Sequence, residues 1–377
     1  MKNNALKTVR TDARPLPAGR VYNFGAGPAM LPTEVMQQAQ SEFLDWQGTG
    51  MSAMEVSHRS EKYMAMAAQT EADLRRLLAV PENYKVLFLQ GGATSQFALA
   101  PQNLLRGKTA ADYLHTGHWS GKALLEARRF CQVNVALSLE KNGYTSIPAP
   151  DTWQLNPDAA YVYYTENETI HGIEFHNIPA AGDVPLVSDM TSSLLSHPLD
   201  IARFGVVFAG AQKNIGPAGL VIVIIRDDLL GGAPRDLPSM SDYAVHAREH
   251  SMYNTPPTYS WYLAGLVLRW TLAQGGVGEM QKRAIRRSEK LYRVIDASGF
   301  YSNPVDVKYR SRMNVPFTLQ DAGLNATFIA AAEAQGLGAL AGHRSVGGMR
   351  ASIYNAMPEK GVDRLVEFMR EFERRYG

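Results

Sequence analysis

Cysteine is almost absent from this chain of 377 residues, because Cys131 is the only one. A disulfide within the chain is therefore impossible, and a structural zinc site built from several cysteines is excluded. Long apolar runs are also missing, since the longest, residues 219–225, is far too short to cross a bilayer. Residues 1–20 lack the apolar middle of a secretory signal. We therefore expect a cytoplasmic protein that contacts no membrane.

A charge excess of one sign is absent as well. The formal net charge is +2, from 38 basic and 36 acidic residues, and no block of lysine or arginine stands out. This balance gives no support for a nucleic-acid-binding surface. The hydrophobic content of 45% is typical of a globular protein with a large core. Residues 1–20 are polar and basic, and we expect them to form a flexible N-terminal extension.

The middle of the chain alternates short apolar runs with helical patterns. One helical pattern covers residues 60–79, with Ser60 as its N-cap. Such alternation predicts an α/β fold whose mostly parallel sheet is covered by helices on both faces. The predicted strands are residues 86–90, 161–165, 186–189, 206–209 and 220–225.

The pattern changes near residue 276. A helical stretch continues to about residue 298, and the chain ends in an amphipathic helix over residues 359–376. Between them, residues 315–319 and 349–353 are typical of strands and residues 325–335 of a helix. This composition predicts a smaller α+β domain at the C-terminal end.

Lys213 gives the strongest chemical signal. It lies in a turn rich in glycine and alanine, between two predicted buried strands. The small neighbours leave room for a planar ligand, and burial would lower the lysine pKa and make the amine a usable nucleophile. The alternative is a loop lysine that reaches solvent.

Asp189 gives the second signal. It stands at the carboxyl end of a predicted strand, where open α/β sheets bind ligands, and it precedes Lys213 by 24 residues. A pyridoxal ring needs a carboxylate at its pyridine nitrogen, because the protonated ring is the electron sink. The alternatives are a helix N-cap or a metal ligand. No histidine, cysteine and carboxylate set at ligand spacing supports a metal.

Two further motifs suit the same ligand. Gly91 and Gly92 follow a predicted strand and precede a helix, so backbone N–H groups at that helix start could hold a phosphate. Trp119 could stack on a flat heteroaromatic ring, although a core tryptophan is an equally good interpretation.

Cationic residues stand beside glycine and serine turns in two places. His58 and Arg59 precede the first long helix, and a glycine-rich stretch over residues 342–350 holds the others. Arginine binds carboxylate or phosphate in a bidentate way. The pairs at 286–287 and 374–375 are interpreted instead as solvated helix faces.

Several motifs in order resemble one known family. The set resembles the phosphoserine aminotransferases, which belong to the class V group of fold-type I pyridoxal-phosphate enzymes. The resemblance covers roughly residues 21–377. Its motifs are residues 23–32 (NFGAGPAMLP), 57–60 (SHRS), 91–92, 117–120 (GHWS), 167–169 (NET), 188–189, 212–214 (QKN), 253–257 (YNTPP) and 342–350 (GHRSVGGMR).

The resemblance implies a fold-type I transferase with a large domain, built on a seven-stranded type of mostly parallel sheet, and a smaller α+β domain. The large domain would span residues 33–275, and the small domain would combine residues 21–32 with 276–377. Pyridoxal 5'-phosphate would be the cofactor, bound covalently by Lys213, which would also act as the catalytic base. Asp189 would pair with the ring nitrogen. The remaining cofactor-binding residues would be Ala93, Thr94, Trp119, Thr169 and Gln212.

The resemblance also implies a homodimer with shared active sites. Asn254 and Thr255 match a pair that reaches the cofactor phosphate of the partner subunit. Arg350 would bind the substrate α-carboxylate. The full set of implied substrate-binding residues is His58, Arg59, His343, Arg344 and Arg350.

The implied reaction converts L-glutamate and 3-phosphohydroxypyruvate into 2-oxoglutarate and O-phospho-L-serine, in serine biosynthesis and in some bacteria also in pyridoxine biosynthesis. One alternative is another class V transaminase of the alanine or serine–glyoxylate type. Such an enzyme would need fewer cations than the sequence offers. A second alternative is a non-catalytic ligand-binding module on the same fold, against which intact Lys213 and Asp189 weigh.

Overall fold

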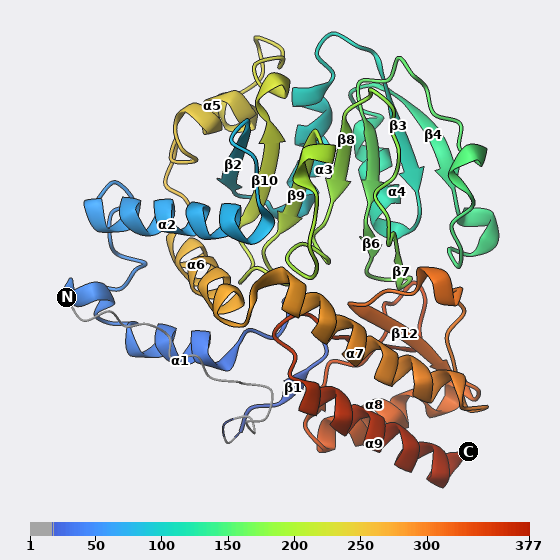
Figure 1. Cartoon of the computed structure of the whole chain (residues 1–377). Helices are drawn as coiled ribbons and strands as arrows, with labels where there is room; N and C mark the ends of the chain where they lie inside the picture. Colours follow the sequence, from blue (N-terminus) through green and yellow to red (C-terminus); the bar gives the residue numbers. More distant parts are fainter. Residues whose placement is uncertain (1–16, 18) are drawn as a thin grey trace.

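The computed structural model describes residue 17 and residues 19–377, and the chain forms a larger upper part and a smaller lower part (Figure 1). The predicted flexible extension, residues 1–20, therefore lies almost entirely outside the described residues. Among the residues that are described, no helix combines the length and apolar character that a membrane span requires.

A seven-stranded sheet forms the centre of the larger part. Strand β10 runs antiparallel to both of its neighbours, and the other pairs are parallel. The predicted fold class, with a mostly parallel sheet, is confirmed. The strand order is β2 (Tyr84–Leu89), β10 (Val221–Arg226), β9 (Val206–Gly210), β8 (Leu186–Asp189), β5 (Val162–Thr165), β3 (Ala110–His115) and β4 (Gln132–Ser138).

Two hydrophobic cores lie on opposite faces of this sheet. In β10, Ile222 and Ile224 belong to one core, while Val221, Val223 and Ile225 belong to the other. Successive side chains of a strand point to opposite faces, so a strand buried on both faces reads as a continuous apolar run. This explains why the sequence revealed β10 so clearly.

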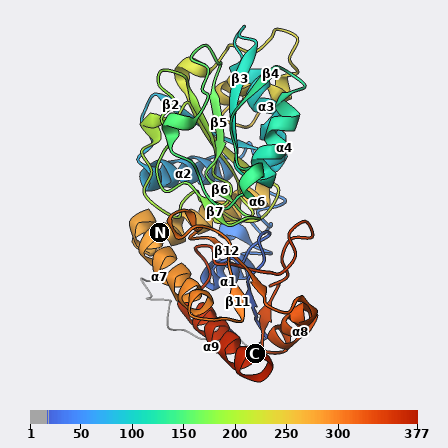
Figure 2. The same cartoon turned by 90° about the vertical axis from the view of Figure 1, so that its right-hand side faces the viewer.

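Helices cover both faces, and Figure 2 shows α2 and α4 on opposite sides of the sheet. Helix α2 (Glu61–Leu78) packs against α6 (Thr258–Ala273), and α3 (Gly92–Leu104) packs against α4 (His118–Ala127). Ser60 caps α2 as predicted, because its side chain accepts a hydrogen bond from the Tyr63 N–H. Two shorter helices complete this part, α1 (Thr33–Ser41) and α5 (Tyr243–Arg248).

The smaller part has its own aromatic-rich core around Phe317, Phe328 and Phe372. A pair of short parallel strands joins the N-terminal segment to it, β1 (Tyr22–Asn23) and β13 (Leu337–Gly338). This pairing agrees with placing residues 21–32 beside the C-terminal region, although the proposed boundaries at 33 and 276 stay a prediction. The other elements are β11 (Tyr301–Ser302), β12 (Asn314–Leu319), β14 (Met349–Ser352), α7 (Gly276–Asp296), α8 (Asn325–Ala334) and α9 (Glu359–Tyr376).

The interpretation of residues 286–287 as a solvated face is wrong for Arg287. Its side chain is only 1% exposed, and its guanidinium donates to the backbone carbonyls of Tyr354, Asn355 and Met357. Those carbonyls lie in the turn before α9, so a buried cation connects α7 to that turn. Arg286 is half exposed and pairs with Glu359 at 2.7 Å.

Candidate active site

A cavity of about 410 Å³ lies where the parallel strands of the large sheet end. Asp189 is the last residue of β8 and Thr165 the last residue of β5, and both line it. Ligands bind at this edge of open α/β sheets. Seven predicted cofactor-binding residues line the cavity: Ala93, Thr94, Trp119, Thr169, Asp189, Gln212 and Lys213.

Lys213 stands in the turn between β9 and β10 and is 9% exposed. Its Nζ donates a hydrogen bond of 2.6 Å to the Thr169 hydroxyl. Burial lowers the pKa of Lys213 to about 8, although the nearby Asp189 carboxylate acts in the opposite direction. The amine therefore loses its proton far more readily than a lysine in water.

Asp189 is buried at the end of β8, and its Oδ1 accepts a hydrogen bond of 2.9 Å from the Thr191 N–H. Burial raises the pKa of Asp189, while hydrogen bonds from Thr191 and the charge of Lys213 lower it. A protonated ring nitrogen beside this carboxylate would stabilise its charged form.

The Trp119 ring lies beside the lysine, with Lys213 Nζ 6.0 Å from the ring centroid. Its indole Nε1 is buried and has no hydrogen-bond partner in the part of the chain that the structure describes. Trp119 belongs to the first turn of α4, so its backbone is fixed by the helix start.

The glycine pair forms the start of α3. Gly91 has φ of 85°, and a Cβ built there would lie 1.9 Å from the Ser95 hydroxyl, so only glycine suits this turn. The N–H groups of the first turn of a helix have no partner within the helix. Those of Ala93 and Thr94, which line the cavity, are thus available for an anion.

These features together fit pyridoxal phosphate. A buried amine, a buried carboxylate and an aromatic ring with an unpartnered nitrogen share one cavity, and a glycine-rich helix start borders it. The cofactor offers an aldehyde, a ring nitrogen, a flat ring and a phosphate, one for each of these features.

The three predicted substrate-binding residues of the C-terminal stretch do not line this cavity, but each interacts with a residue that lines it or adjoins it. Arg350, on β14, has a charge that lowers the Lys213 pKa, and its Nε is buried without a hydrogen-bond partner among the described residues. The His343 ring lies 5.4 Å from the ring of His118, which neighbours Trp119. The positive charge of Arg344 acts on the same His118.

Four other predicted residues do not line the cavity either. His58 and Arg59 lie in the loop before α2, and Asn254 and Thr255 lie between α5 and α6. Among the described contacts, one hydrogen bond links this group to the glycine-rich turn, from Gln90 Nε2 to the Thr255 carbonyl at 3.2 Å. Within a single chain, these four residues are not part of the site.

Sequence reasoning missed several residues that line the cavity. Gly27 and Pro28 come from the N-terminal segment, and the Ala29 N–H donates to the Gln212 carbonyl beside Lys213. The motif at 23–32 contains no pattern that indicates contact with residue 212. Asn167, Thr191 and Ser192 also line the cavity.

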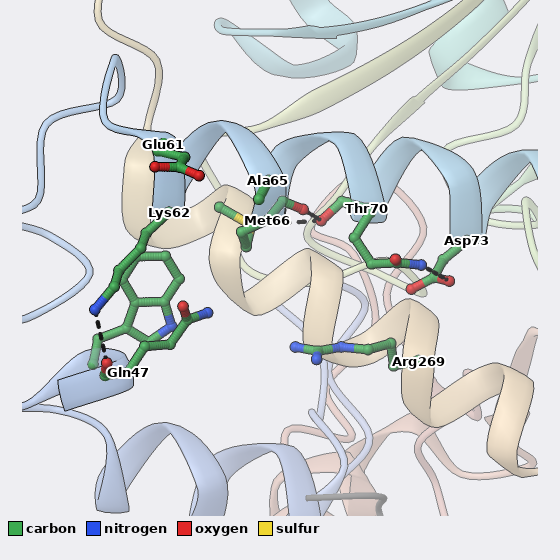
Figure 3. A pocket seen from close by; sticks show the side chains of 10 residues that line it. Gln47, Glu61, Lys62, Ala65, Met66, Thr70, Asp73 and Arg269 are labelled. Atoms are coloured by element: carbon green, nitrogen blue, oxygen red, sulfur yellow. Dashed lines mark hydrogen bonds between the residues drawn. The ribbon is translucent and has the colours of Figure 1, made fainter. Parts of the chain in front are cut away.

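A second cavity, of about 420 Å³, lies between α2, α6 and Trp46 (Figure 3). Its walls carry Lys62, whose Nζ donates to the Gln47 carbonyl, and Asp73, which accepts from Gln69. Figure 3 shows the Arg269 side chain reaching into it from α6. None of the sequence-predicted site residues lines this cavity.

Comparison with known proteins supports the interpretation of this cavity as the site of a pyridoxal-phosphate enzyme. Residues 21–365 match the family model described as aminotransferase class-V. The chain is 58% identical to the phosphoserine aminotransferase of Hahella chejuensis over 94% of this chain and 98% of that protein. It is 57% identical to the phosphoserine aminotransferase of Pseudomonas putida, over 95% of this chain and 99% of that protein.

Solved structures give the same result. The phosphoserine aminotransferase of Bacillus circulans subsp. alkalophilus superposes with a TM-score of 0.92 at 47% identity, covering 95% of this chain and 99% of that one. The pyridoxal-phosphate-bound phosphoserine aminotransferase of Trichomonas vaginalis superposes with a TM-score of 0.89 at 40% identity. The match covers 93% of this chain and 100% of that one. An alanine–glyoxylate aminotransferase of Nostoc gives 0.70 at only 17% identity over 98% and 99%, which is a likeness of fold alone. This chain therefore belongs to the phosphoserine aminotransferase family of the class-V, pyridoxal-phosphate-dependent aminotransferases.

Proposed function

We propose that this enzyme transfers the amino group of L-glutamate to 3-phosphohydroxypyruvate, giving 2-oxoglutarate and O-phospho-L-serine. The observation that carries the proposal is the shared cavity of Lys213 and Asp189, in a chain 58% identical to a phosphoserine aminotransferase. When bound, pyridoxal phosphate supplies an electron sink that stabilises negative charge at the substrate α-carbon.

Lys213 is proposed as the base that moves the proton at that carbon. Its lowered pKa suits this role, because a general base works best when its pKa is near the working pH. Thr169 holds Nζ in place through the 2.6 Å hydrogen bond. Asp189 would keep the ring nitrogen of the cofactor protonated, and Trp119 would pack against its ring.

The basic residues are proposed to bind the substrate. Arg350 has an unpartnered Nε near Lys213, which suits a clamp for the α-carboxylate common to both substrates. Arg344 offers further positive charge for the substrate phosphate. His343, whose pKa is lowered by burial and by the charges of Arg350 and Arg344, offers a ring N–H as a hydrogen-bond donor. This pair is the feature that favours a phosphorylated acceptor over pyruvate or glyoxylate.

A homodimer would complete the site. His58, Arg59, Asn254 and Thr255 lie outside the cavity of their own chain, and we propose that they reach the site of a second subunit. Exposed apolar side chains before and within α2 support an interface there, because large apolar patches mark protein contacts. They are Phe43, Leu44, Met51, Met54 and Met64.

We also infer a cytoplasmic location. The single thiol, Cys131, is half-buried and donates weakly to the Ala127 carbonyl, which suits a reducing compartment. Tagged enzyme found in the periplasmic fraction of a bacterium that expresses it would contradict this.

A panel of amino acceptors tests the proposed reaction. Purified enzyme with glutamate is offered phosphohydroxypyruvate, hydroxypyruvate, pyruvate and glyoxylate in parallel. We expect kcat/KM for the phosphorylated acceptor to exceed the others by about a hundredfold or more, since the phosphate makes several charge-assisted hydrogen bonds. A preference for glyoxylate or pyruvate would favour the alternative class V transaminase. A protein that stays colourless with pyridoxal phosphate would favour the non-catalytic module.

A further inference from the structure

Glu168 is a buried acid to which the sequence assigned no role. It lies in β6 (Asn167–Glu168), which forms a two-stranded hairpin with β7 (Ile173–Glu174), and its side chain is fully buried. A buried carboxylate is costly unless several donors satisfy it. Its hydrogen-bond partners therefore indicate which part of the structure it positions.

All described partners of this carboxylate belong to the first turn of α4. Oε2 accepts from the Trp119 N–H at 3.0 Å. Oε1 accepts from the Ser120 N–H at 2.8 Å and from the Ser120 hydroxyl at 2.7 Å. A negative charge at a helix N-terminus is favourable, because the first N–H groups have no partner within the helix.

The next residue in the chain holds the lysine. Thr169 accepts the hydrogen bond from Lys213 Nζ, while Glu168 fixes the backbone of Trp119. Two neighbouring residues, Glu168 at the end of β6 and Thr169 directly after it, thus control the position of the amine and of the aromatic ring. Any shift of this hairpin would move both together.

The charge of Glu168 also acts at the site. Burial is the largest cause that lowers the pKa of Lys213, and Arg350 lowers it further. Asp189 and Glu168 are the two acids that raise it. Burial in turn raises the pKa of Glu168 itself, against hydrogen bonds from Ser120 and Trp119.

We propose that Glu168 is a positioning residue, which sets the Trp119 ring against the cofactor and supplies negative charge to the lysine end of the site. The inference rests on the proposed function, since it assumes that the cavity holds pyridoxal phosphate. A helix cap with no further role would make the same three hydrogen bonds, so the test must measure the cofactor itself.

The first variant is Glu168→Gln, with Glu126→Gln as the matched control. Glu126 lies on the same helix, but it is partly exposed and pairs with Arg129. In Glu168→Gln the amide NH₂ must face one of the backbone N–H donors, and the negative charge is lost. Cofactor affinity is measured by absorbance titration, and the pH midpoint of the visible band of the loaded enzyme by spectrophotometry.

We expect Glu168→Gln to bind pyridoxal phosphate roughly tenfold more weakly, the effect of one lost hydrogen bond to a charged group. The pH midpoint of the visible band should fall, because the lost charge had favoured the protonated nitrogen. Glu126→Gln should leave both unchanged. An unchanged affinity and midpoint in a folded Glu168→Gln protein would reduce Glu168 to a helix cap and overturn the proposal.

A second variant, Gly117→Ala, keeps the charge and moves the carboxylate. A Cβ on Gly117 would lie 2.5 Å from Glu168 Cδ, so the side chain must shift. Weaker cofactor binding, with a smaller change of the pH midpoint than in Glu168→Gln, supports the proposal. Wild-type affinity for the cofactor contradicts it. Neither measurement uses an amino acceptor, so a wrong substrate assignment would appear only in the acceptor panel and leave these results intact.

Discussion

At the scale of single residues, the chemistry depends on how burial acts on Lys213. An exposed lysine is charged at neutral pH and cannot attack an aldehyde. Burial makes the ammonium easier to deprotonate, while the acid Asp189 in the same cavity limits the effect, so the pKa of Lys213 is about 8 rather than lower. The Thr169 hydroxyl then fixes the direction of the amine.

Replacing Lys213 by Ala should abolish transamination, by about a thousandfold or more, because Lys213 is the only lysine among the described residues that line the cavity. Borohydride reduction of the loaded protein, followed by mass spectrometry, checks this. Lys122→Ala is the matched control, since Lys122 lies over the same Trp119 ring, with Nζ 5.4 Å from its centroid. Covalently fixed cofactor in Lys213→Ala would refute the assignment.

The lowered pKa of Lys213 predicts a pH dependence of cofactor capture. Only the neutral amine reacts, so the rate at which cofactor-free protein captures pyridoxal phosphate should rise as pH increases through about 8 and then level off. Stopped-flow absorbance between pH 6 and pH 10 measures it. A rate that keeps rising towards the ordinary lysine pKa of about 10.4 would show that the amine is solvated.

At the scale of helices and strands, apolar runs in the sequence predicted the strands that are buried along their whole length. They did not predict strands that polar residues interrupt. Strands β8, β9 and β10 were predicted from apolar runs. Strands β3 and β4 were not, because β3 contains the buried Asp112, whose carboxylate accepts hydrogen bonds from Asn134 in β4 and from the Asn156 N–H. A buried acid satisfied by distant residues looks like a loop residue in the sequence.

Arg287 makes a testable connection between α7 and the turn before α9. Arg287→Met keeps much of the side-chain volume but leaves the carbonyls of Tyr354, Asn355 and Met357 without this donor. We expect a loss of about 2–4 kcal/mol in the free energy of unfolding, as for other buried charged networks. Urea denaturation measures it. Arg374→Met, at an exposed pair with Glu371, should cost under about 1 kcal/mol; equal effects would contradict the burial argument.

At the scale of the whole molecule, the cavity is assembled from distant parts of the chain. Gly27 and Pro28 come from the N-terminal segment, and Lys213 comes from the turn between β9 and β10 of the large sheet. Arg350, on the small C-terminal sheet, adds its charge to the lysine end of the cavity. A hydrogen bond of 2.8 Å from Asn167 Nδ2 to Asn314 Oδ1 joins the β6–β7 hairpin beside the site to the small C-terminal sheet. The proposed dimer would add a further source, the loops that hold His58 and Asn254.

Subunit mixing tests the shared site. Lys213→Ala and Arg59→Leu are each expected to be inactive or nearly so as pure dimers. In a mixed dimer, one site would combine an intact Lys213 with an intact Arg59 from the other subunit. Random mixing after mild dissociation makes about half of the dimers mixed, and each mixed dimer has one intact site out of two. The mixture should therefore recover about a quarter of wild-type activity. No recovery, with mixed dimers verified by mass spectrometry, would show that each site uses its own Arg59.

The sequence by itself determined the cofactor chemistry, because a lysine and an aspartate at the ends of successive buried strands must meet at one edge of a parallel sheet. It also determined the α/β class and the cap of α2, which depend on local patterns. Tertiary structure alone decided the burial of Arg287, the place of β3 and β4, and the partners of Glu168. Each of these depends on hydrogen bonds between residues far apart in the chain, and such pairs leave no periodic pattern in it.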